Sequence, residues 1–132
     1  MSENENIICK VVLIGESGVG KTSIISRFVE NEFYSSLEST IGASFSTKSI
    51  YVGEEEGENN LIKLEIWDTS GITKYRSLTK FFCKNSPVCV LVYDITKRSS
   101  FEEIKNYWIH EVTSEASNTS MFLIYFLIYF LF

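Results

Sequence analysis

One eight-residue segment restricts the possible folds of this chain more than any other feature. Gly15-Glu16-Ser17-Gly18-Val19-Gly20-Lys21-Thr22 fits the pattern GxxxxGK[ST]. It follows Ile7–Ile14, a β-branched and nearly continuous apolar run that is typical of a strand buried on both faces. It precedes residues 21–31, where apolar side chains recur at helical spacing. The segment therefore predicts a strand–loop–helix unit.

The residue types in this loop favour phosphate binding. Glycines allow backbone angles that turn successive N–H groups toward one point, and the helix N-terminus adds its partial positive charge there. Lys21 supplies a full positive charge for terminal phosphates, and the Thr22 hydroxyl can ligate Mg²⁺. A nucleotide phosphate site is expected at this loop.

The rest of the chain predicts further strands and one further helix. Residues 43–52 and 61–67 alternate apolar and polar side chains around an acidic loop with glycine, which predicts a β-hairpin with a solvated tip. Val88–Tyr93 reads as another buried strand, and Ser100 with Glu103 predicts a capping box at the start of the following helix. This order predicts an α/β fold in which helices cover a mostly parallel sheet.

A second chemical group stands at the end of the hairpin. Trp67-Asp68-Thr69-Ser70-Gly71 places a carboxylate at the carboxyl end of a strand, beside the phosphate loop. From there Asp68 can reach a bound metal ion through water. Alone, an aspartate that merely ends a strand is the simpler interpretation.

Composition excludes several classes of protein. The chain has 132 residues, enough for one domain, and a net charge of −5, which argues against a nucleic-acid binder with a basic face. Its three cysteines form no CxxC pair and favour buried, reduced thiols in a cytoplasmic protein. The polar and acidic start of the chain does not read as a secretory signal.

In combination, these motifs resemble the small GTPases of the Ras superfamily and, within it, the Rab family. The resemblance implies an α/β P-loop NTPase fold, a three-layer sandwich incomplete at the C-terminus. It divides the chain into a flexible acidic N-terminus (1–6), a partial small GTPase domain (7–117) and an atypical apolar segment (118–132). The stretches that carry it are GESGVGKTS (15–23), ESTIGASF (38–45), KLEIWDTSG (63–71), YRSLT (75–79), VLVYDIT (90–96) and SFEEIKNYW (100–108).

The resemblance implies a switch in vesicle traffic that binds GTP or GDP with Mg²⁺. Its partners would be effectors, exchange factors and GTPase-activating proteins, and it would sit in the cytoplasm and peripherally on endomembranes. The Thr40–Phe45 run resembles the early-endosomal Rab group in particular. One alternative is a non-catalytic or defunct P-loop fragment. Another is a P-loop kinase, which the hairpin between the two nucleotide motifs fits less well.

The resemblance also assigns residues. Phe33 matches the family's aromatic residue that packs near the guanine. Thr40 matches the threonine of the first switch. Gly71 matches the glycine of the second switch, whose N–H contacts the γ-phosphate. The metal set would be Thr22, Thr40 and Asp68. An effector-binding triad would be Phe45, Trp67 and Phe82, for which plain hairpin packing is the alternative. The nucleotide-binding set would be Gly15, Ser17, Gly18, Val19, Gly20, Lys21, Thr22, Ser23, Phe33, Tyr34, Thr40 and Gly71.

The sequence departs from the family pattern at several positions. The family's second switch ends in a glutamine that orients the attacking water, but here that position is Ile72, so impaired hydrolysis is expected and no catalytic residue is assigned. The guanine-reading Asn-Lys-x-Asp motif would fall near residues 126–129, which read Phe126-Leu-Ile-Tyr129. No cysteine follows Cys89, so no prenyl anchor is expected in this chain.

Residues 121–132 are twelve consecutive apolar or aromatic residues. A spanning helix needs about 20 residues, so this segment is too short to cross a bilayer. Three interpretations stay open: a fifth strand docked on the sheet, a read-through or mis-spliced end, and a tail that dips into a membrane.

Overall fold

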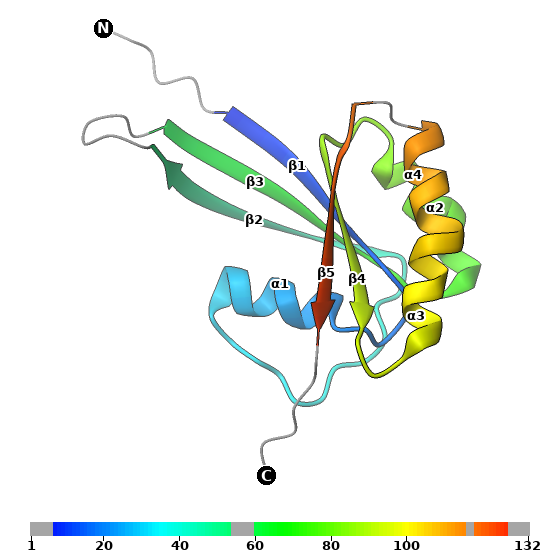
Figure 1. The fold of residues 1–132 in the computed structure, drawn as a ribbon. Coiled ribbons are helices and arrows are strands. Elements are labelled where there is room, and N and C mark those ends of the chain that lie inside the picture. Colours follow the sequence, from blue (N-terminus) through cyan, green and yellow to red (C-terminus); the bar gives the residue numbers. More distant parts are fainter. Residues whose placement is uncertain (1–6, 54–59, 116–117, 127–132) are drawn as a thin grey trace, which may run out of the picture.

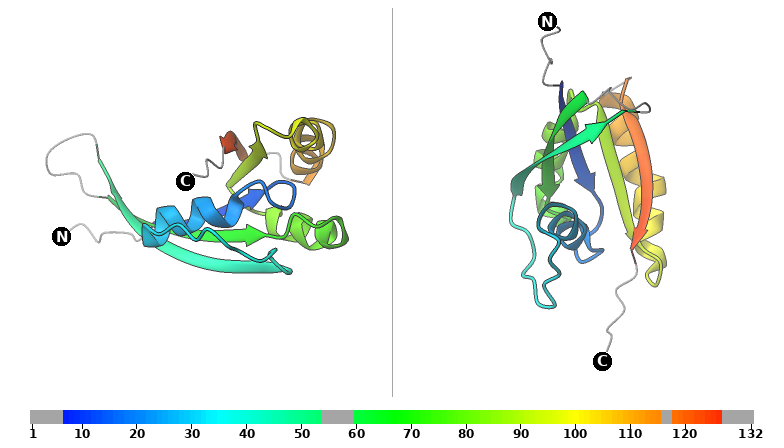
Figure 2. Two further views of the ribbon diagram at one scale, coloured as in Figure 1. Left: turned by 90° about the horizontal axis from the view of Figure 1, so that it is seen from below. Right: turned by 90° about the vertical axis from the view of Figure 1, so that its left-hand side faces the viewer.

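The computed structural model describes residues 7–53, 60–115 and 118–126. They form a five-stranded sheet with helices on both of its faces (Figures 1 and 2), which confirms the predicted layered α/β fold. The last helices form one continuous rod that contains a single π-helical segment, η2. In chain order the elements are β1 (Ile7–Ile14), α1 (Lys21–Glu30), β2 (Ala43–Val52), β3 (Asn60–Thr69), η1 (Thr73–Tyr75), α2 (Arg76–Cys83), β4 (Val88–Asp94), α3 (Arg98–Glu103), η2 (Ile104–Trp108), α4 (Ile109–Glu115) and β5 (Ser120–Phe126).

The strand order of the sheet is β2-β3-β1-β4-β5. β1 runs parallel to both β3 and β4, β5 runs parallel to β4, and β2 pairs antiparallel with β3, as the hairpin prediction requires. Leu13 of β1 is level with Asp68 on one side and with Val90 on the other. The carboxyl ends of β1 and β3 therefore meet at one edge, where the phosphate loop begins. The predicted acidic hairpin tip lies at residues 54–59, outside the described residues.

Alternate side chains of the parallel strands enter two separate cores. Val12 and Ile14 pack with Ile104 and Trp108 on the face covered by α2, α3, η2 and α4. Leu13 packs with α1 on the opposite face. Burial on both faces explains the apolar residues at the carboxyl-terminal end of β1, residues 12–14, whereas Ile7 and Ile8 at its start are exposed. The cysteines carry free thiols, of which those of Cys83 and Cys89 are buried.

The predicted capping box is wrong. The helix begins at Arg98, with Lys97 as its N-cap, so Ser100 lies inside its first turn and is fully buried. The Ser100 hydroxyl lies 2.7 Å from the Lys97 carbonyl oxygen and accepts the Asp94 N–H at 3.0 Å. Ser100 therefore closes the turn between β4 and α3 and does not cap the helix through Glu103.

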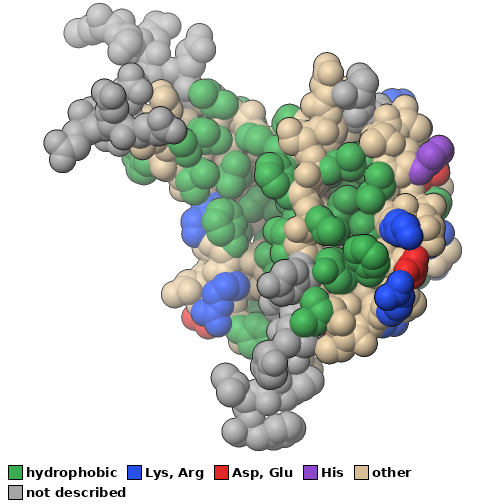
Figure 3. Space-filling model, viewed as in Figure 1, with side chains coloured by type: hydrophobic (Ala, Val, Ile, Leu, Met, Phe, Trp, Pro, Cys, Tyr) green, Lys and Arg blue, Asp and Glu red, His purple; other side chains and the backbone are tan. Residues whose placement is uncertain are grey.

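The apolar C-terminal segment forms β5 over residues 120–126, as the docked-strand interpretation predicted. Figure 3 shows hydrophobic side chains gathered over this face of the molecule. In β5, Phe122 and Leu123 are 54% and 53% exposed. Residues 127–132 lie outside the described part of the chain. Over the residues that are described, no helix is long and apolar enough to cross a membrane.

Candidate functional site

The loop between β1 and α1 is the centre of the candidate site. Gly20, the residue before α1, has a φ of 101°, in the left-handed region that favours glycine. This angle lets the chain turn directly from the loop into the helix. Gly15 lies against the β4 backbone at Val92, and Val19 is buried in the α1 core, so both support the loop from behind.

Lys21 is an almost fully buried cation, only 5% exposed. Its Nζ donates hydrogen bonds to the carbonyl oxygens of Gly15 and Glu16, both at 2.8 Å, so the side chain folds back over the loop. Burial lowers the pKa of Lys21 to about 8, although the negative charges of Asp68, Glu103 and Glu16 oppose that shift. A desolvated cation at the mouth of a loop favours the binding of an anion.

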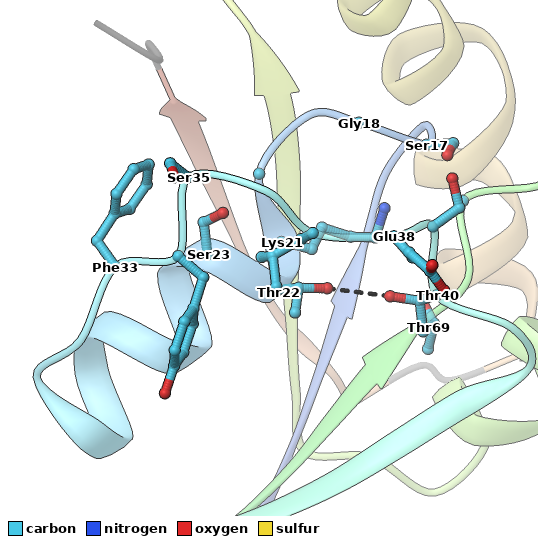
Figure 4. Close-up of a pocket in the computed structure, with 15 residues that line it drawn as sticks. Ser17, Gly18, Lys21, Thr22, Ser23, Phe33, Ser35, Glu38, Thr40 and Thr69 are labelled. Atoms are coloured by element: carbon cyan, nitrogen blue, oxygen red, sulfur yellow. Dashed lines mark hydrogen bonds between the residues drawn. The ribbon is translucent and has the colours of Figure 1, made fainter. Parts of the chain in front are cut away.

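The predicted metal set comes together in front of this loop. The Thr22 hydroxyl lies 3.0 Å from the Thr40 hydroxyl (Figure 4) and donates to Asp68 Oδ2 at 2.5 Å. Asp68 is 3% exposed, and its Oδ1 has no hydrogen-bond partner in the described part of the chain. Burial raises the pKa of Asp68 above its ordinary value, while the bond from Thr22 and the charge of Lys21 act the other way.

These donors fit Mg²⁺. All three are oxygens, the ligand type that Mg²⁺ prefers, and Asp68 Oδ1, which has no partner within the described ranges, can accept a metal-bound water. One carboxylate and two hydroxyls cannot fill six positions, so phosphate oxygens and water must supply the rest, as is usual for this ion. Consistent with that, the described residues contain no cluster of three or more His, Cys, Asp or Glu that could hold a metal by itself.

A pocket of about 240 Å³ joins the phosphate loop to the segments that follow α1 and β3 (Figure 4). Phe33 stands at its far end, and Tyr34 beside it donates a hydrogen bond from its hydroxyl to Glu30 at 3.1 Å. The sequence did not single out Ser35, Leu37, Glu38, Ser39 and Thr69, which also line the pocket. The residues of the predicted nucleotide set that line it are Ser17, Gly18, Gly20, Lys21, Thr22, Ser23, Phe33, Tyr34, Thr40 and Gly71.

Gly71 brings the segment after β3 onto the phosphate loop. A Cβ at this position would lie 2.1 Å from the Ser17 nitrogen and 2.6 Å from the Gly15 oxygen, too close for any side chain. The next residue, Ile72, donates its N–H to the Ser70 hydroxyl at 3.3 Å. The loop and the predicted second switch are therefore in direct backbone contact, which only glycine allows.

A long-range ion pair anchors the phosphate loop from the other side. Lys97, just before α3, places its Nζ 2.9 Å from Glu16 Oε1, and Glu16 Oε2 is buried with no partner among the described residues. These residues are 81 positions apart, and no local pattern in the sequence could have paired them.

The three aromatic residues of the predicted triad form one cluster. The rings of Phe45 and Trp67 are 4.9 Å apart, and Trp67 stacks on Phe82 at 4.5 Å. Trp67 and Phe82 also pack against the core, so packing explains part of their placement, whereas Phe45 is 47% exposed. Phe81, which the sequence did not single out, extends the cluster edge-on to Phe82 at 5.7 Å.

Comparison with known proteins places the fold and the site in a wider context. A family model described as the Ras family matches residues 10–126. The chain is 40% identical over 118 residues to Ras-related protein RABA2d of Arabidopsis thaliana, an alignment that covers 89% of this chain and 52% of that protein. It is 39% identical over 117 residues to Ras-related protein Rab-25 of Homo sapiens, with the same coverage of each chain. The chain thus spans about half the length of the curated relatives it matches.

Proposed function

The chain belongs to the Ras family, and we propose on that basis that it acts as a Rab-type switch in intracellular vesicle traffic, binding GTP or GDP with Mg²⁺. Membership of the Ras family implies a nucleotide-binding switch. The observation that carries the proposal is the single pocket in which the phosphate loop, Thr40 and Gly71 meet. A switch needs such a meeting point because the ligand must contact the segments that change.

Each part of the pocket would have its own task. Lys21 would turn from the loop carbonyls to the terminal phosphates, and Thr22, Thr40 and Asp68 would hold Mg²⁺ directly or through water. When bound, Mg²⁺ would neutralise negative charge on the phosphate oxygens. Thr40 and the Gly71 N–H would contact the last phosphate, so that its loss releases both segments.

Hydrolysis by this chain is proposed to be slow. Phosphoryl transfer to water depends on positioning, and a side chain next to Gly71 is well placed to hold the attacking water. Ile72 occupies that position with an apolar side chain, and its N–H already bonds to Ser70. Any GTP-bound form would therefore persist unless a partner protein supplied the missing group.

The alternative function is that of a P-loop nucleotide binder without guanine selectivity. A specific observation favours it: the expected register of Asn-Lys-x-Asp, residues 126–129, holds no carboxylate or amide. Among the described residues that line the pocket, the one with a carboxylate side chain is Glu38, on the segment after α1. Resemblance to the Rab family supports GTP as the ligand, whereas the apolar residues at 126–129 favour weak discrimination between guanine and other bases.

The nucleotide proposal is tested with two substitutions at the loop. Lys21→Ala removes the buried charge, and Thr22→Asn alters the metal ligand, so both should weaken binding of a fluorescent guanine nucleotide with Mg²⁺ by at least about tenfold. Lys63→Ala, an exposed lysine on β3, is the matched control and should bind like the parent. Chromatography of nucleotide released from the purified protein identifies the natural ligand. Parent-like binding by both loop variants would rule out this pocket as the site.

The proposed partners follow from the Rab resemblance and the aromatic cluster. Effectors would contact Phe45, Trp67 and Phe82, and exchange factors and GTPase-activating proteins would act on the two switch segments. Peripheral endomembrane association is part of the same proposal, and the Thr40–Phe45 run favours the early endosome. Colocalisation of the tagged chain with early-endosomal markers tests it, and uniform distribution in the cell would argue against it.

A further inference from the structure

We propose that Cys83 and Cys89 form a reversible disulfide that links the end of α2 to β4 when the protein is exposed to glutathione disulfide. The two residues are called the α2–β4 thiol pair below. They belong to the core beneath α2, and neither lines the nucleotide pocket. The inference goes beyond the proposed function and can be tested independently of it.

The two thiols of the pair are in contact. Cys83 is the last residue of α2 and Cys89 the second residue of β4, and both belong to the same core cluster. Cys83 is 2% and Cys89 0% exposed, and their side chains share a hydrogen bond. Sulfur atoms in such contact need to approach only from a hydrogen-bond distance to the covalent S–S length of about 2.05 Å.

The chain between the two cysteines is a tight turn. The Ser86 N–H donates to the Cys83 carbonyl oxygen at 3.1 Å, and the Ser86 hydroxyl lies 3.2 Å from the Lys10 carbonyl oxygen of β1. Asn85 has a φ of 60°, in the left-handed region that asparagine adopts more readily than most residues. These contacts hold the end of α2 beside the start of β4, so the disulfide can form without rearrangement of either element.

One thiol of the pair is the better nucleophile. The hydrogen bond from Cys83 lowers the pKa of Cys89, and the charge of Lys10 acts in the same direction, although burial opposes both. The same hydrogen bond and burial raise the pKa of Cys83. Lys10 reaches the end of α2, where its Nζ lies 3.5 Å from the Lys84 carbonyl oxygen. Cys89 is therefore the thiol that loses its proton first, and the thiolate is the form that attacks a disulfide.

The reaction is an exchange with glutathione disulfide. Because both cysteines are buried, it begins when the turn over residues 84–87 opens. The Cys89 thiolate attacks one sulfur of glutathione disulfide, whose S–S bond breaks, and a glutathione thiolate leaves. Cys83 then attacks the Cys89 sulfur and displaces the second glutathione, and the protons of both cysteines pass to the departing thiolates. Two cysteine thiols are oxidised, one glutathione disulfide is reduced to two thiols, and excess reduced glutathione reverses the exchange.

Cys9 is an internal control on the other face of the sheet. Side chains of a strand alternate between its faces, so Cys9 shares the face of Leu13, which packs in the α1 core. Val12, level with Cys89, packs in the core beneath α2. The sheet therefore separates Cys9 from the α2–β4 thiol pair. A folded protein should join Cys83 to Cys89 and leave Cys9 free, whereas an unfolded chain can join any two of the three.

The disulfide would restrain the last turn of α2. Arg76 and Lys80 hold the helix through ion pairs with Glu103 and Glu111, and both of these ion pairs lie before Cys83 in the helix. The disulfide adds a covalent link at its last residue. Amide hydrogen exchange at residues 80–84 should therefore be at least about fivefold slower in the oxidised protein than in the reduced one.

The test is equilibration of the parent protein, without nucleotide, in buffers of reduced and oxidised glutathione. The reaction is quenched with acid, free thiols are alkylated, and the protein is digested with trypsin without reductant. Trypsin separates the three cysteines into peptides 1–10, 81–84 and 85–97. We expect peptide 81–84 linked to peptide 85–97, with Cys9 alkylated. The equilibrium constant for this link should be at least about tenfold larger in the native protein than in urea, because the native fold holds the two sulfurs together.

The variants separate this pair from other thiol chemistry. Cys9→Ser is the matched control and should form the link as the parent does, whereas Cys83→Ala and Cys89→Ala should each abolish it. Three results would overturn the inference: linkage of Cys9 in the native protein, an equilibrium constant no larger in the native protein than in urea, or exchange at residues 80–84 that oxidation leaves unchanged. The main measurement uses the parent without nucleotide, so neither a variant that fails to fold nor failure of the nucleotide proposal alters its outcome.

Discussion

The buried charge of Lys21 predicts that one substitution has opposite effects on stability and on ligand binding. Lys21→Met keeps most of the side-chain volume and removes the charge. Without nucleotide, the parent must keep an ammonium group at 5% exposure among backbone carbonyls, which is unfavourable. We therefore expect the methionine variant to be more stable than the parent when no nucleotide is present, and unable to gain stability when it is added.

The magnitude follows from the surroundings of Lys21. Burial lowers its pKa from 10.5 to about 8, which at about 1.36 kcal/mol per pKa unit corresponds to about 3 kcal/mol against the charged form. Methionine leaves the Gly15 and Glu16 carbonyl oxygens without their donor, a loss of about 0.5–1.5 kcal/mol each. The net gain is about 1 kcal/mol, or a Tm higher by about 3–5 °C for a domain of this size.

The assay is thermal unfolding of both proteins, first with nucleotide and Mg²⁺ removed by chelation and then with saturating nucleotide. At 100 times Kd the ligand should stabilise the parent by about 2.7 kcal/mol and the variant by almost nothing, so their order reverses. The pH dependence supplies a second check. Since the unfolded lysine binds its proton up to pH 10.5, the penalty is full below pH 8 and declines as the pH rises above it. A variant less stable than the parent without ligand, or a gap that does not narrow above pH 8, would refute the reasoning.

Three further predictions concern the same pocket. Ile72→Gln should accelerate single-turnover hydrolysis of bound GTP by about 10–100-fold because it restores a water-positioning group, and an unchanged rate in a protein that binds GTP would contradict this. In competition assays ATP should displace bound GTP within about tenfold of GTP itself, whereas a preference near 10⁴ would reveal a base-reading group outside residues 126–129. Lys97→Ala should weaken nucleotide binding about twofold to fivefold, since it leaves the Glu16 charge unpaired in the phosphate loop, and Glu16→Gln in the same chain should restore it. If the effects of Lys97→Ala and Glu16→Gln on nucleotide affinity simply add, the ion pair between these residues does not contribute to nucleotide binding.

The sequence predicted the strands well wherever burial alone determined them. The continuous apolar run predicted the observed bounds of β1, Ile7–Ile14. Only its last three residues, 12–14, are fully buried, whereas Ile7 and Ile8 are exposed. β3 was expected over residues 61–67 but extends over Asn60–Thr69. The extension ends in a buried threonine, Thr69, whose hydroxyl donates to the Leu13 carbonyl oxygen at 2.6 Å. The prediction depended on alternating apolar and polar side chains. A buried polar residue whose hydroxyl bonds to a neighbouring strand interrupts that alternation.

The features that the sequence did not predict correctly have a common physical cause. The Ser100 hydroxyl found a partner in the turn before its helix, and the spacing to Glu103 could not exclude this. The bond between Glu16 and Lys97 and the contact between Phe81 and Phe82 depend on how elements pack. Motifs locate groups that act on a shared ligand, because the ligand imposes the spacing. Groups that act on one another across the fold leave no such spacing in the sequence.

The candidate site gathers several buried charged groups at one edge of the sheet. Lys21 is a desolvated cation and Asp68 a desolvated carboxyl, and Asp68 and Glu16 each have one buried carboxylate oxygen with no hydrogen-bond partner among the described residues. In a closed core these groups would be replaced by apolar ones at a gain in stability. Anionic phosphates and a cation would relieve Lys21 and Asp68 at once, so binding free energy and folding free energy are coupled here. Under the proposed function, the stability of this chain should therefore depend more on a bound nucleotide than on any contact within the pocket.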